Sequence, residues 1–259
     1  MTTSRRMLIL EQLGLLPLWV PRGMARDAGQ TKDPLDQGPM VQTPVVAPVQ
    51  PDAMGLTGPD DRGERIGRMS WPELKEAVRG CAACPLHVAR TQSVFGVGDE
   101  QADWLFVGEG PGAEEDARGE PFVGQAGKLL DNMLAAIGIK RGHDVYIANI
   151  VKCRPPGNRV PDPREAEQCA PFLRRQIALI QPRLIVALGK TAASHLLSTE
   201  ASLGSLRGRV HDFHGTALLV TYHPAYLLRN PPDKAKAWED LCLARETMQR
   251  LKSEQSAPI

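Results

Sequence analysis

The chain has 259 residues, enough for one large domain or two small ones, and its 42% apolar residues are sufficient for a packed core. The formal net charge of +1 is too small to indicate a nucleic-acid-binding protein by itself. Five cysteines, an odd number, argue against the disulfide framework of a small secreted protein. Composition therefore predicts a globular protein of the cytoplasm and leaves its function open.

The N-terminal quarter is predicted to lie outside the folded domain. Residues 5–20 have the pattern of a short amphipathic helix, and residues 32–59 carry six prolines without any hydrophobic period. Such a composition is typical of a disordered linker. We therefore divide the chain into an N-terminal peptide with its linker (residues 1–64) and a folded domain (residues 65–259).

Two functions are considered for the N-terminal peptide. Arg5 and Arg6 precede an apolar run, as in an export signal, but Glu11 and Gln12 interrupt that run and it is too short to span a bilayer. The segment QLGLL (12–16) loosely resembles the peptides that dock on bacterial sliding clamps, although it lacks their terminal Phe. A sliding clamp is therefore a candidate partner, the alternative is a helix that packs on the domain, and no attachment to a membrane is expected.

From residue 70 onward, apolar runs alternate with helical patterns. Buried strands are predicted at DWLFVG (103–108), VYIANI (145–150), RLIVALG (183–189) and ALLVTY (217–222). Helices are predicted at SWPELKEAVRG (70–80), with Ser70 as the N-cap, and over 125–138, 164–180, 190–198 and 233–251. Continuous apolar strands that alternate with helices indicate an α/β fold with a parallel sheet covered on both faces.

Two unusual loops are expected to meet at one edge of this sheet. The stretch GEGPGAEEDARGEPFVGQAG (108–127) follows the first strand, and YHPAYLLRNP (222–231) follows the fourth. In open α/β sheets, ligands bind beyond the carboxyl ends of the strands. The first loop is rich in glycine but carries five carboxylates, which would repel a phosphate and must serve another purpose.

Four cysteines could form a metal centre. Cys81 and Cys84 form a Cys-x-x-Cys pair, and Cys153 and Cys169 follow singly. Four thiolates can bind a tetrahedral zinc ion or an iron–sulfur cluster, and the spacing does not distinguish the two. The alternative is a redox-active pair with two unrelated buried cysteines. The fifth cysteine, Cys242, is predicted to be an ordinary thiol on a helix face.

Taken together, these motifs resemble the family 4 uracil-DNA glycosylases, the iron–sulfur branch of that superfamily. The resemblance covers about residues 70 to 251 and depends on four stretches in a specific order: CAACPLHVARTQSVFGVGD, LFVGEGPGAEEDARGEPFVGQAGKLLDNML, YIANIVKCRPPGNRVPDPREAEQC and TYHPAYLLRNP. It implies a three-layer α/β/α sandwich with a central four-stranded parallel sheet. It also implies that Cys81, Cys84, Cys153 and Cys169 bind a [4Fe–4S] cluster with a structural role.

The implied activity is repair of uracil in DNA. The enzyme would flip the base out of single- or double-stranded DNA, hydrolyse its N-glycosidic bond and leave an abasic site. The resemblance further suggests a monomer that acts at the nucleoid.

The resemblance and the chemistry of the reaction suggest roles for residues of both loops and of the segment 149–158 between them. The expected catalytic residues are the carboxylates of Glu109 and Glu115, which would act on the sugar and the attacking water, and the imidazole of His223, which would donate to uracil O2. The expected substrate-binding residues are Gly110 through its N–H, Phe122 by stacking, Asn149 by reading the base edge and Asn158 by positioning water. The expected DNA-binding residues are Leu227 and Leu228 as a wedge and Arg229 as a phosphate anchor.

Three rival functions are compared with this one. A non-catalytic module that binds uracil-DNA would lack the carboxylate, Asn and His set, which this chain contains. A related branch traps DNA covalently through a His in an insert after the third cysteine, but the segment 153–169 contains no His. A zinc-dependent deaminase would need a His-x-Glu motif before a Pro-Cys-x-x-Cys motif, which the sequence lacks.

Overall fold

A computed structural model of the chain describes the backbone of residues 59–256 and the side chains of residues 62–254. The amphipathic helix, most of the linker and the candidate clamp-binding peptide lie outside the described residues. The first described element is helix α2 (Pro59–Gly67), which includes Arg65, the residue where the folded domain is expected to begin.

The sheet contains the four predicted strands and two more. In chain order its strands are β1 (Val97–Gly98), β2 (Trp104–Gly108), β3 (Val145–Asn149), β4 (Leu184–Leu188), β5 (His211–Phe213) and β6 (Thr216–Thr221). Their order in space is β1-β3-β2-β4-β6-β5, in which β3, β2, β4 and β6 are parallel neighbours. Strands β1 and β5 are antiparallel to these and form the two edges. The expected four-stranded parallel sheet is therefore wrong as stated, because the sheet is mixed and has six strands.

The two edge strands escape sequence analysis for a physical reason. Strand β1 has two residues, and β5 has three residues that are only partly buried. Neither shows the continuous apolar run that identifies the central strands. In β2, β3 and β4, by contrast, all five residues are buried.

The five predicted helices are all present, together with short helices that were not predicted. The described helical elements after α2 are α3 (Trp71–Arg79), α4 (Leu86–Ala89), α5 (Ala113–Arg118), α6 (Gln125–Ala136), the 3₁₀ turn η1 (Pro156–Asn158), α7 (Pro163–Ile180), α8 (Lys190–Leu197), α9 (Leu203–Leu206), α10 (Pro224–Arg229), the 3₁₀ turn η2 (Pro231–Asp233) and α11 (Lys234–Ser256). Local capping explains two of the starts. Glu73 accepts a hydrogen bond from the backbone N–H of Ser70 before α3, and Asp162 accepts one from the N–H of Arg164 at the start of α7.

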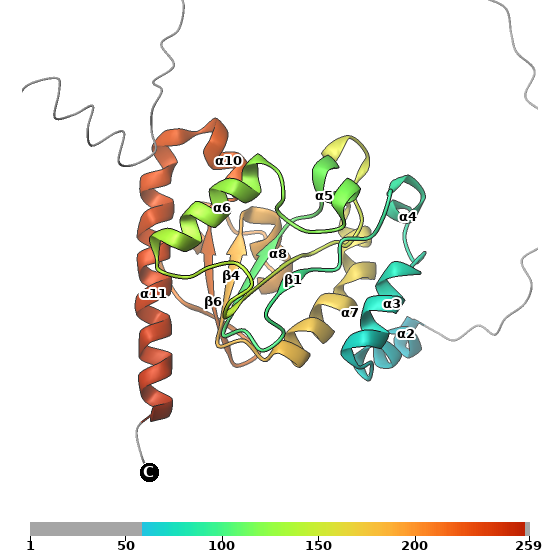
Figure 1. Ribbon diagram of the computed structural model, residues 1–259, viewed down its shortest axis with the longest axis horizontal. Coiled ribbons are helices and arrows are strands. Elements are labelled where there is room, and N and C mark those ends of the chain that lie inside the picture. Colours follow the sequence, from blue (N-terminus) through green and yellow to red (C-terminus); the bar gives the residue numbers. More distant parts are fainter. Residues whose placement is uncertain (1–58, 257–259) are drawn as a thin grey trace, which may run out of the picture. The chain divides into compact units, whose positions relative to one another are not determined.

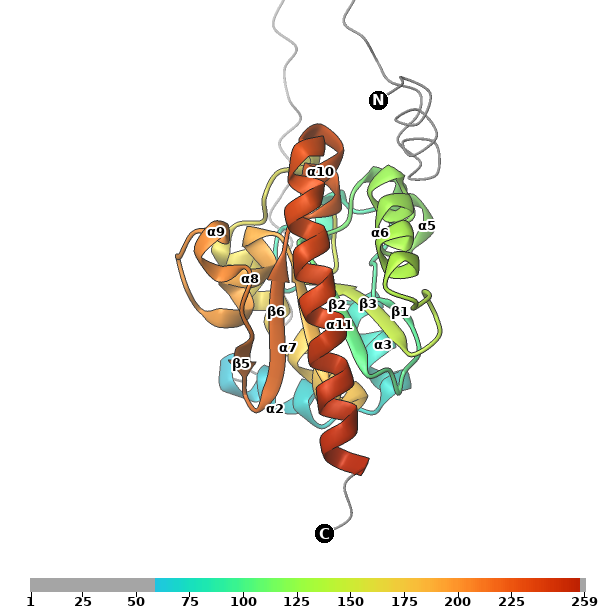
Figure 2. The same cartoon turned by 90° about the vertical axis from the view of Figure 1, so that its left-hand side faces the viewer.

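Two apolar cores lie on opposite faces of the sheet. On one face, α6, α10 and α11 cover the strands, and the long helix α11 runs across the sheet (Figures 1 and 2). On the other face, the buried core includes residues of α2, α3, α7, α8 and α9. The described part of the chain therefore has the expected three α/β/α layers. No helix in this part combines the length and the apolar character needed to cross a membrane.

Candidate active site

A cavity of about 560 Å³ opens at the carboxyl ends of the parallel strands, where the two unusual loops meet. Eight of the predicted site residues line it: Glu109, Gly110, Glu115, Phe122, Asn149, Asn158, His223 and Arg229. The register of the sheet explains the convergence, since Gly108 at the end of β2 pairs with Asn149 at the end of β3. Residues from three of the four stretches that carry the resemblance thus share one pocket.

Phe122 lies in the wall of this pocket, held in a constrained backbone conformation. Its side chain is 5% exposed, and its φ angle of +55° is uncommon for a residue other than glycine. The Arg141 guanidinium donates hydrogen bonds to the carbonyls of Pro121 (2.9 Å) and Phe122 (2.8 Å). Gly108 makes room for the ring, since a Cβ there would lie 2.6 Å from it. The loop is therefore built to hold this ring in one place.

Asn149 presents an unsatisfied polar atom. Its side chain is 2% exposed, and its Oδ1 is buried without a hydrogen-bond partner among the described residues. A buried polar group without a partner costs about 1–3 kcal/mol, so it indicates a ligand that supplies the missing donor. The ligand of this pocket should therefore carry an N–H or O–H group toward Asn149.

His223 is held as a neutral hydrogen-bond donor. It is the N-cap of α10, and its Nδ1 accepts a hydrogen bond from the backbone N–H of Ala225 at 3.1 Å. The proton of the neutral ring must therefore sit on Nε2. Burial, helped by the charge of Arg229, lowers the pKa of His223 to about 4. The ring centroid lies 5.5 Å from that of Phe122, so this donor borders the same part of the pocket.

Glu109 is held by one of its two carboxylate oxygens. The hydroxyl of Thr191 donates to Oε2 at 2.5 Å, and Oε1 has no hydrogen-bond partner among the described residues. Thr191 lines the pocket but is absent from the residues predicted from sequence. The topology could have revealed it, because it lies in the first turn of α8, which follows β4 at the same edge of the sheet.

Two other carboxylates of this loop are saturated by backbone donors. Glu115 Oε1 accepts from the N–H groups of Val123 (2.9 Å) and Gly124 (3.1 Å), and its Oε2 accepts from Gly112 (3.1 Å). Asp116 is buried, and both of its oxygens accept from the N–H of Thr91, at 2.9 and 3.0 Å. Although Glu115 lines the pocket, its contacts are those of a group that braces the Phe122 loop.

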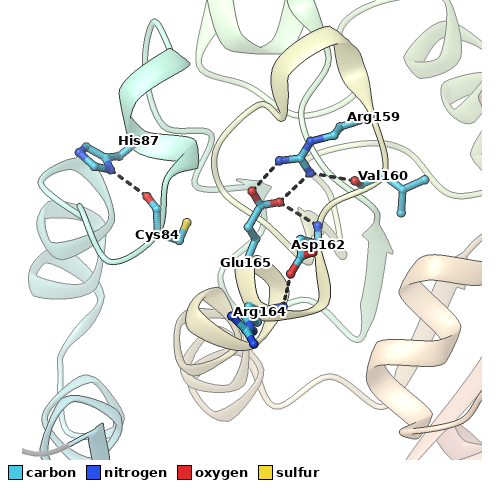
Figure 3. A network of polar contacts seen from close by, with 7 residues as sticks. All are labelled: Cys84, His87, Arg159, Val160, Asp162, Arg164 and Glu165. Carbon is cyan, nitrogen blue, oxygen red and sulfur yellow. Dashed lines mark hydrogen bonds and ion pairs between the residues drawn. The ribbon is translucent and has the colours of Figure 1, made fainter.

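The loop that follows β3 is stiffened by ion pairs at the rim of the pocket. Arg159 forms two hydrogen bonds with the buried carboxylate of Glu165, at 2.8 and 2.6 Å, and the N–H of Asp162 also donates to Glu165 (Figure 3). These contacts hold the pKa of Glu165 below its usual range. Asn158 Oδ1 accepts a hydrogen bond from Arg154 at 2.7 Å, so an arginine also fixes the orientation of this amide.

The two predicted wedge leucines have different environments. Leu227 is 1% exposed and packs in the core cluster that also contains Phe122 and Leu130. Leu228 is 44% exposed, and Arg229 lines the pocket beside it. Of the two leucines, only Leu228 is exposed.

The four candidate metal ligands lie around one small cavity. Cys81, Cys84, Cys153 and Cys169 all line it, and Cys153 and Cys169 are buried. Burial raises the pKa of the Cys84 and Cys153 thiols and raises that of Cys169 to about 12, so a metal would have to displace their protons. Between residues 62 and 254, no three His, Cys, Asp or Glu side chains are arranged to hold a metal ion.

Hydrogen-bond donors surround the sulfur atoms of this cysteine cavity. Arg90 Nη1 lies 2.9 Å from the sulfur of Cys153, Arg62 Nη2 lies 3.7 Å from that of Cys81, and a backbone N–H lies 3.3 Å from that of Cys169. N–H groups directed at sulfur are a feature of iron–sulfur sites, where they tune the reduction potential. The chemistry of the donor set therefore fits a bound cluster.

Comparison with known proteins agrees with this geometry. Residues 95–242 match the model of the uracil DNA glycosylase superfamily. The chain is 50% identical to a type-4 uracil-DNA glycosylase of Thermotoga maritima over 61% of this chain and 82% of that protein. It is 41% identical to one of Pyrobaculum aerophilum over 68% and 93%, and 30% identical to a type-5 uracil-DNA glycosylase of Thermus thermophilus over 57% and 84%.

The chain therefore belongs to the uracil-DNA glycosylase superfamily. Within it, the higher identity to the type-4 proteins places the chain in the type-4 group, which confirms the resemblance found in the sequence.

Proposed function

We propose that this protein removes uracil from DNA by hydrolysing the bond between C1′ of the deoxyribose and N1 of the base. The observation that carries the proposal is the buried, unpartnered Oδ1 of Asn149. It lies in the same pocket as the ring of Phe122 and a neutral imidazole donor. The names of the type-4 relatives support this activity.

The selection of uracil follows from the amide of Asn149. Its Oδ1 can accept the N3–H of uracil, and its Nδ2 can donate to O4. Cytosine presents the opposite pattern, an acceptor at N3 and a donor at N4, so it would leave the buried amide unsatisfied. A site built to pair with a hydrogen-bonding group rejects an analogue that lacks it by a large factor. The ring of Phe122 would stack on the flipped base.

Departure of the base is assisted by His223. As the C1′–N1 bond breaks, its electron pair moves onto the uracil ring and negative charge develops at O2. The Nε2–H of His223 can donate to this oxygen, because its other nitrogen is held by Ala225. The backbone N–H of Gly110, which lines the same pocket, is a second candidate donor. Such pre-oriented donors stabilise the transition state electrostatically.

The sugar and the attacking water are assigned to Glu109. Its free Oε1 can stabilise the positive charge that develops on the sugar and accept a proton from the water that adds to C1′. Thr191 holds the other oxygen and thereby orients the carboxylate. Asn158 is proposed to help position that water from the opposite loop. Glu115 is proposed to brace the loop, since three backbone N–H groups occupy its oxygens.

DNA would be gripped by the end of α10. Leu228 is exposed and can fill the space that the flipped nucleotide leaves in the base stack. Arg229, beside it at the mouth of the pocket, can bind the neighbouring phosphate. Either single- or double-stranded DNA could supply the nucleotide.

The cofactor is proposed to be a [4Fe–4S] cluster, held by Cys81, Cys84, Cys153 and Cys169. When bound, it would brace the loops on either side of it. Support comes from the common cavity of the four cysteines and from the N–H groups directed at three of the sulfur atoms. We further propose that the protein acts as a monomer in the cytoplasm at the nucleoid and that the peptide at residues 12–16 binds a sliding clamp.

The test is release of free uracil from an oligonucleotide with one deoxyuridine, in the presence of EDTA. The wild type should release uracil. Asn149→Asp should release it at least about 100-fold more slowly and should excise cytosine to a measurable extent, because a protonated carboxyl can donate where the amide accepted. Asn132→Asp, an exposed change on α6, is the matched control and should behave as the wild type.

One outcome would favour a different function. If the wild type carries an intact iron–sulfur chromophore and binds uracil-DNA but releases no uracil, the glycosylase proposal fails. The non-catalytic uracil-DNA binding module would then be the better description.

A further inference from the structure

A lysine lies in the interior between the uracil pocket and the cysteine cavity. Lys152 is 1% exposed, and its ammonium donates hydrogen bonds to the backbone carbonyl of Asn149 at 3.0 Å and to Oε1 of Gln176 at 2.6 Å. Between residues 62 and 254, no Asp or Glu forms an ion pair with it. Burial of an ammonium group without a counter-charge is costly, so fully buried lysines are rare unless they are paired. The charge of Lys152 therefore needs an explanation.

The cysteine cavity offers that counter-charge. Lys152 lines the cavity together with the four cysteines, and its backbone N–H donates to the sulfur of Cys169 at 3.3 Å. Four thiolates carry more negative charge than a [4Fe–4S] core carries positive charge, so the bound cluster would be anionic. Arg62 and Arg90 direct their guanidinium groups at sulfur atoms from the outer side. Lys152 is the cation on the side of the uracil pocket.

The other end of this lysine reaches the residue that reads the base. Asn149 is the last residue of β3, and its carbonyl accepts the hydrogen bond from Lys152. Gln176, which accepts the second hydrogen bond, is itself fixed by donating to the carbonyl of Phe95 at 3.0 Å. The ammonium therefore has a defined position from which it holds the main chain under Asn149.

We propose that Lys152 is a positioning residue that couples the iron–sulfur cluster to uracil recognition: it is the buried counter-charge of the cluster and it holds the main chain of Asn149. This inference rests on the proposed cluster. It gives the cluster an electrostatic function in addition to bracing loops. Loss of the cluster would leave the ammonium without its counter-charge and would loosen the end of β3.

The experiment compares two variants of the intact holoprotein with the wild type. Lys152→Gln removes the charge but keeps an N–H donor for the carbonyl of Asn149, and Lys152→Met removes both. Lys140→Met, an exposed lysine, is the matched control. Two quantities are measured: the midpoint reduction potential of the cluster by a spectroscopic redox titration, and the dissociation constant of labelled free uracil by equilibrium dialysis.

The proposal predicts a specific pattern. Both Lys152 variants should have a more negative midpoint potential than the wild type, since removal of a nearby positive charge disfavours the reduced, more anionic cluster. Lys152→Met should raise the dissociation constant of uracil about tenfold, with a smaller rise for Lys152→Gln. Faster loss of the visible chromophore from variants that keep the wild-type circular dichroism would also support the counter-charge. The control should match the wild type throughout.

Two results would overturn the proposal. An unchanged midpoint potential in both variants would show that Lys152 is not the counter-charge of the cluster. A shifted potential with unchanged uracil affinity would show that the lysine does not act on Asn149. Neither result depends on turnover, so both are distinct from a failure of the glycosylase activity, which is tested on the wild type alone.

Discussion

The acidic residues at the end of β2 and those in helix α5 differ in how their carboxylate oxygens are occupied. Glu109, at the end of β2, accepts one hydrogen bond from Thr191 and keeps its second oxygen open to the pocket. Glu115 and Asp116, in helix α5, have both oxygens occupied by backbone N–H groups. The carboxylates of this glycine-rich stretch therefore differ in purpose: that of Glu109 is the one proposed for chemistry at the sugar, and the other two satisfy the main chain of a tight loop.

Groups with a proposed chemical role differ from structural groups in how many of their hydrogen-bonding atoms are occupied. The groups assigned to chemistry keep one hydrogen-bonding atom open: Oε1 of Glu109, Oδ1 of Asn149 and Nε2 of His223. In each case another contact holds the residue, from Thr191, Lys152 or Ala225. A residue that is held at one atom and open at another is pre-organised for a ligand, whereas a saturated residue only stabilises the fold.

The largest effect is expected at Glu109. Glu109→Gln keeps the size of the side chain but removes its negative charge and basicity, so single-turnover uracil release should fall about 10³-fold. The free energy of unfolding should change by less than about 0.5 kcal/mol, because the carboxylate has one hydrogen bond to lose. Rapid-quench measurement of uracil release and urea denaturation give the two values. If Glu109→Gln lost stability but kept its activity, Glu109 would be the structural carboxylate and the catalytic role would pass to Glu115.

A change at Glu115 should affect stability more than activity. Glu115→Gln places an NH₂ group where backbone N–H donors converge, and should lower the free energy of unfolding by about 2 kcal/mol. Uracil release should fall only about tenfold, through a loosened Phe122 loop. Glu114→Gln, an exposed change one residue earlier, is the control for charge and should match the wild type. A 10³-fold loss of activity in Glu115→Gln without loss of stability would make Glu115 a catalytic group.

A third prediction concerns pH. The pKa of His223 is about 4 in the folded protein and about 6.5 in an unfolded chain, so the unfolded state binds more protons between these values. Stability is therefore complete above pH 6.5 and falls as the pH drops toward 4, by up to about 3 kcal/mol from this residue. His223→Gln should lose less stability than the wild type between pH 7 and 4.5 in urea denaturation. His143→Gln, an exposed change, should follow the wild type. Equal acid sensitivity of all three proteins would contradict the low pKa.

Much of the fold could be read from the sequence, because burial leaves a strong pattern. The four central strands lie within one residue of their predicted bounds, and α6, α7 and α8 within two. The edge strands could not be predicted, since their pairing depends on neighbours that are distant in the sequence. Tertiary contacts decide such short segments, and local propensity does not.

The site could be predicted in most of its members, Thr191 being missed, but not in its contacts. Eight of the predicted residues line one pocket, because loops at the carboxyl ends of parallel strands must converge. The sequence could not distinguish the open carboxylate of Glu109 from the saturated one of Glu115, nor the buried Leu227 from the exposed Leu228. Those differences depend on which backbone groups face each side chain, which only the packed structure defines.

Helix α10 has a consequence for how damage would be sensed. His223 is the N-cap of this short helix and Leu228 lies near its end, so the proposed donor for the departing base and the proposed side chain for the vacated stack belong to one element. Leu228 follows His223 by five positions, which corresponds to about 7.5 Å along a helix axis. Buried Leu227 anchors the helix in the core, so neither end can move alone. Under the proposed roles of His223 and Leu228, this helix fixes the spacing between the flipped base and the gap that it leaves in the stack.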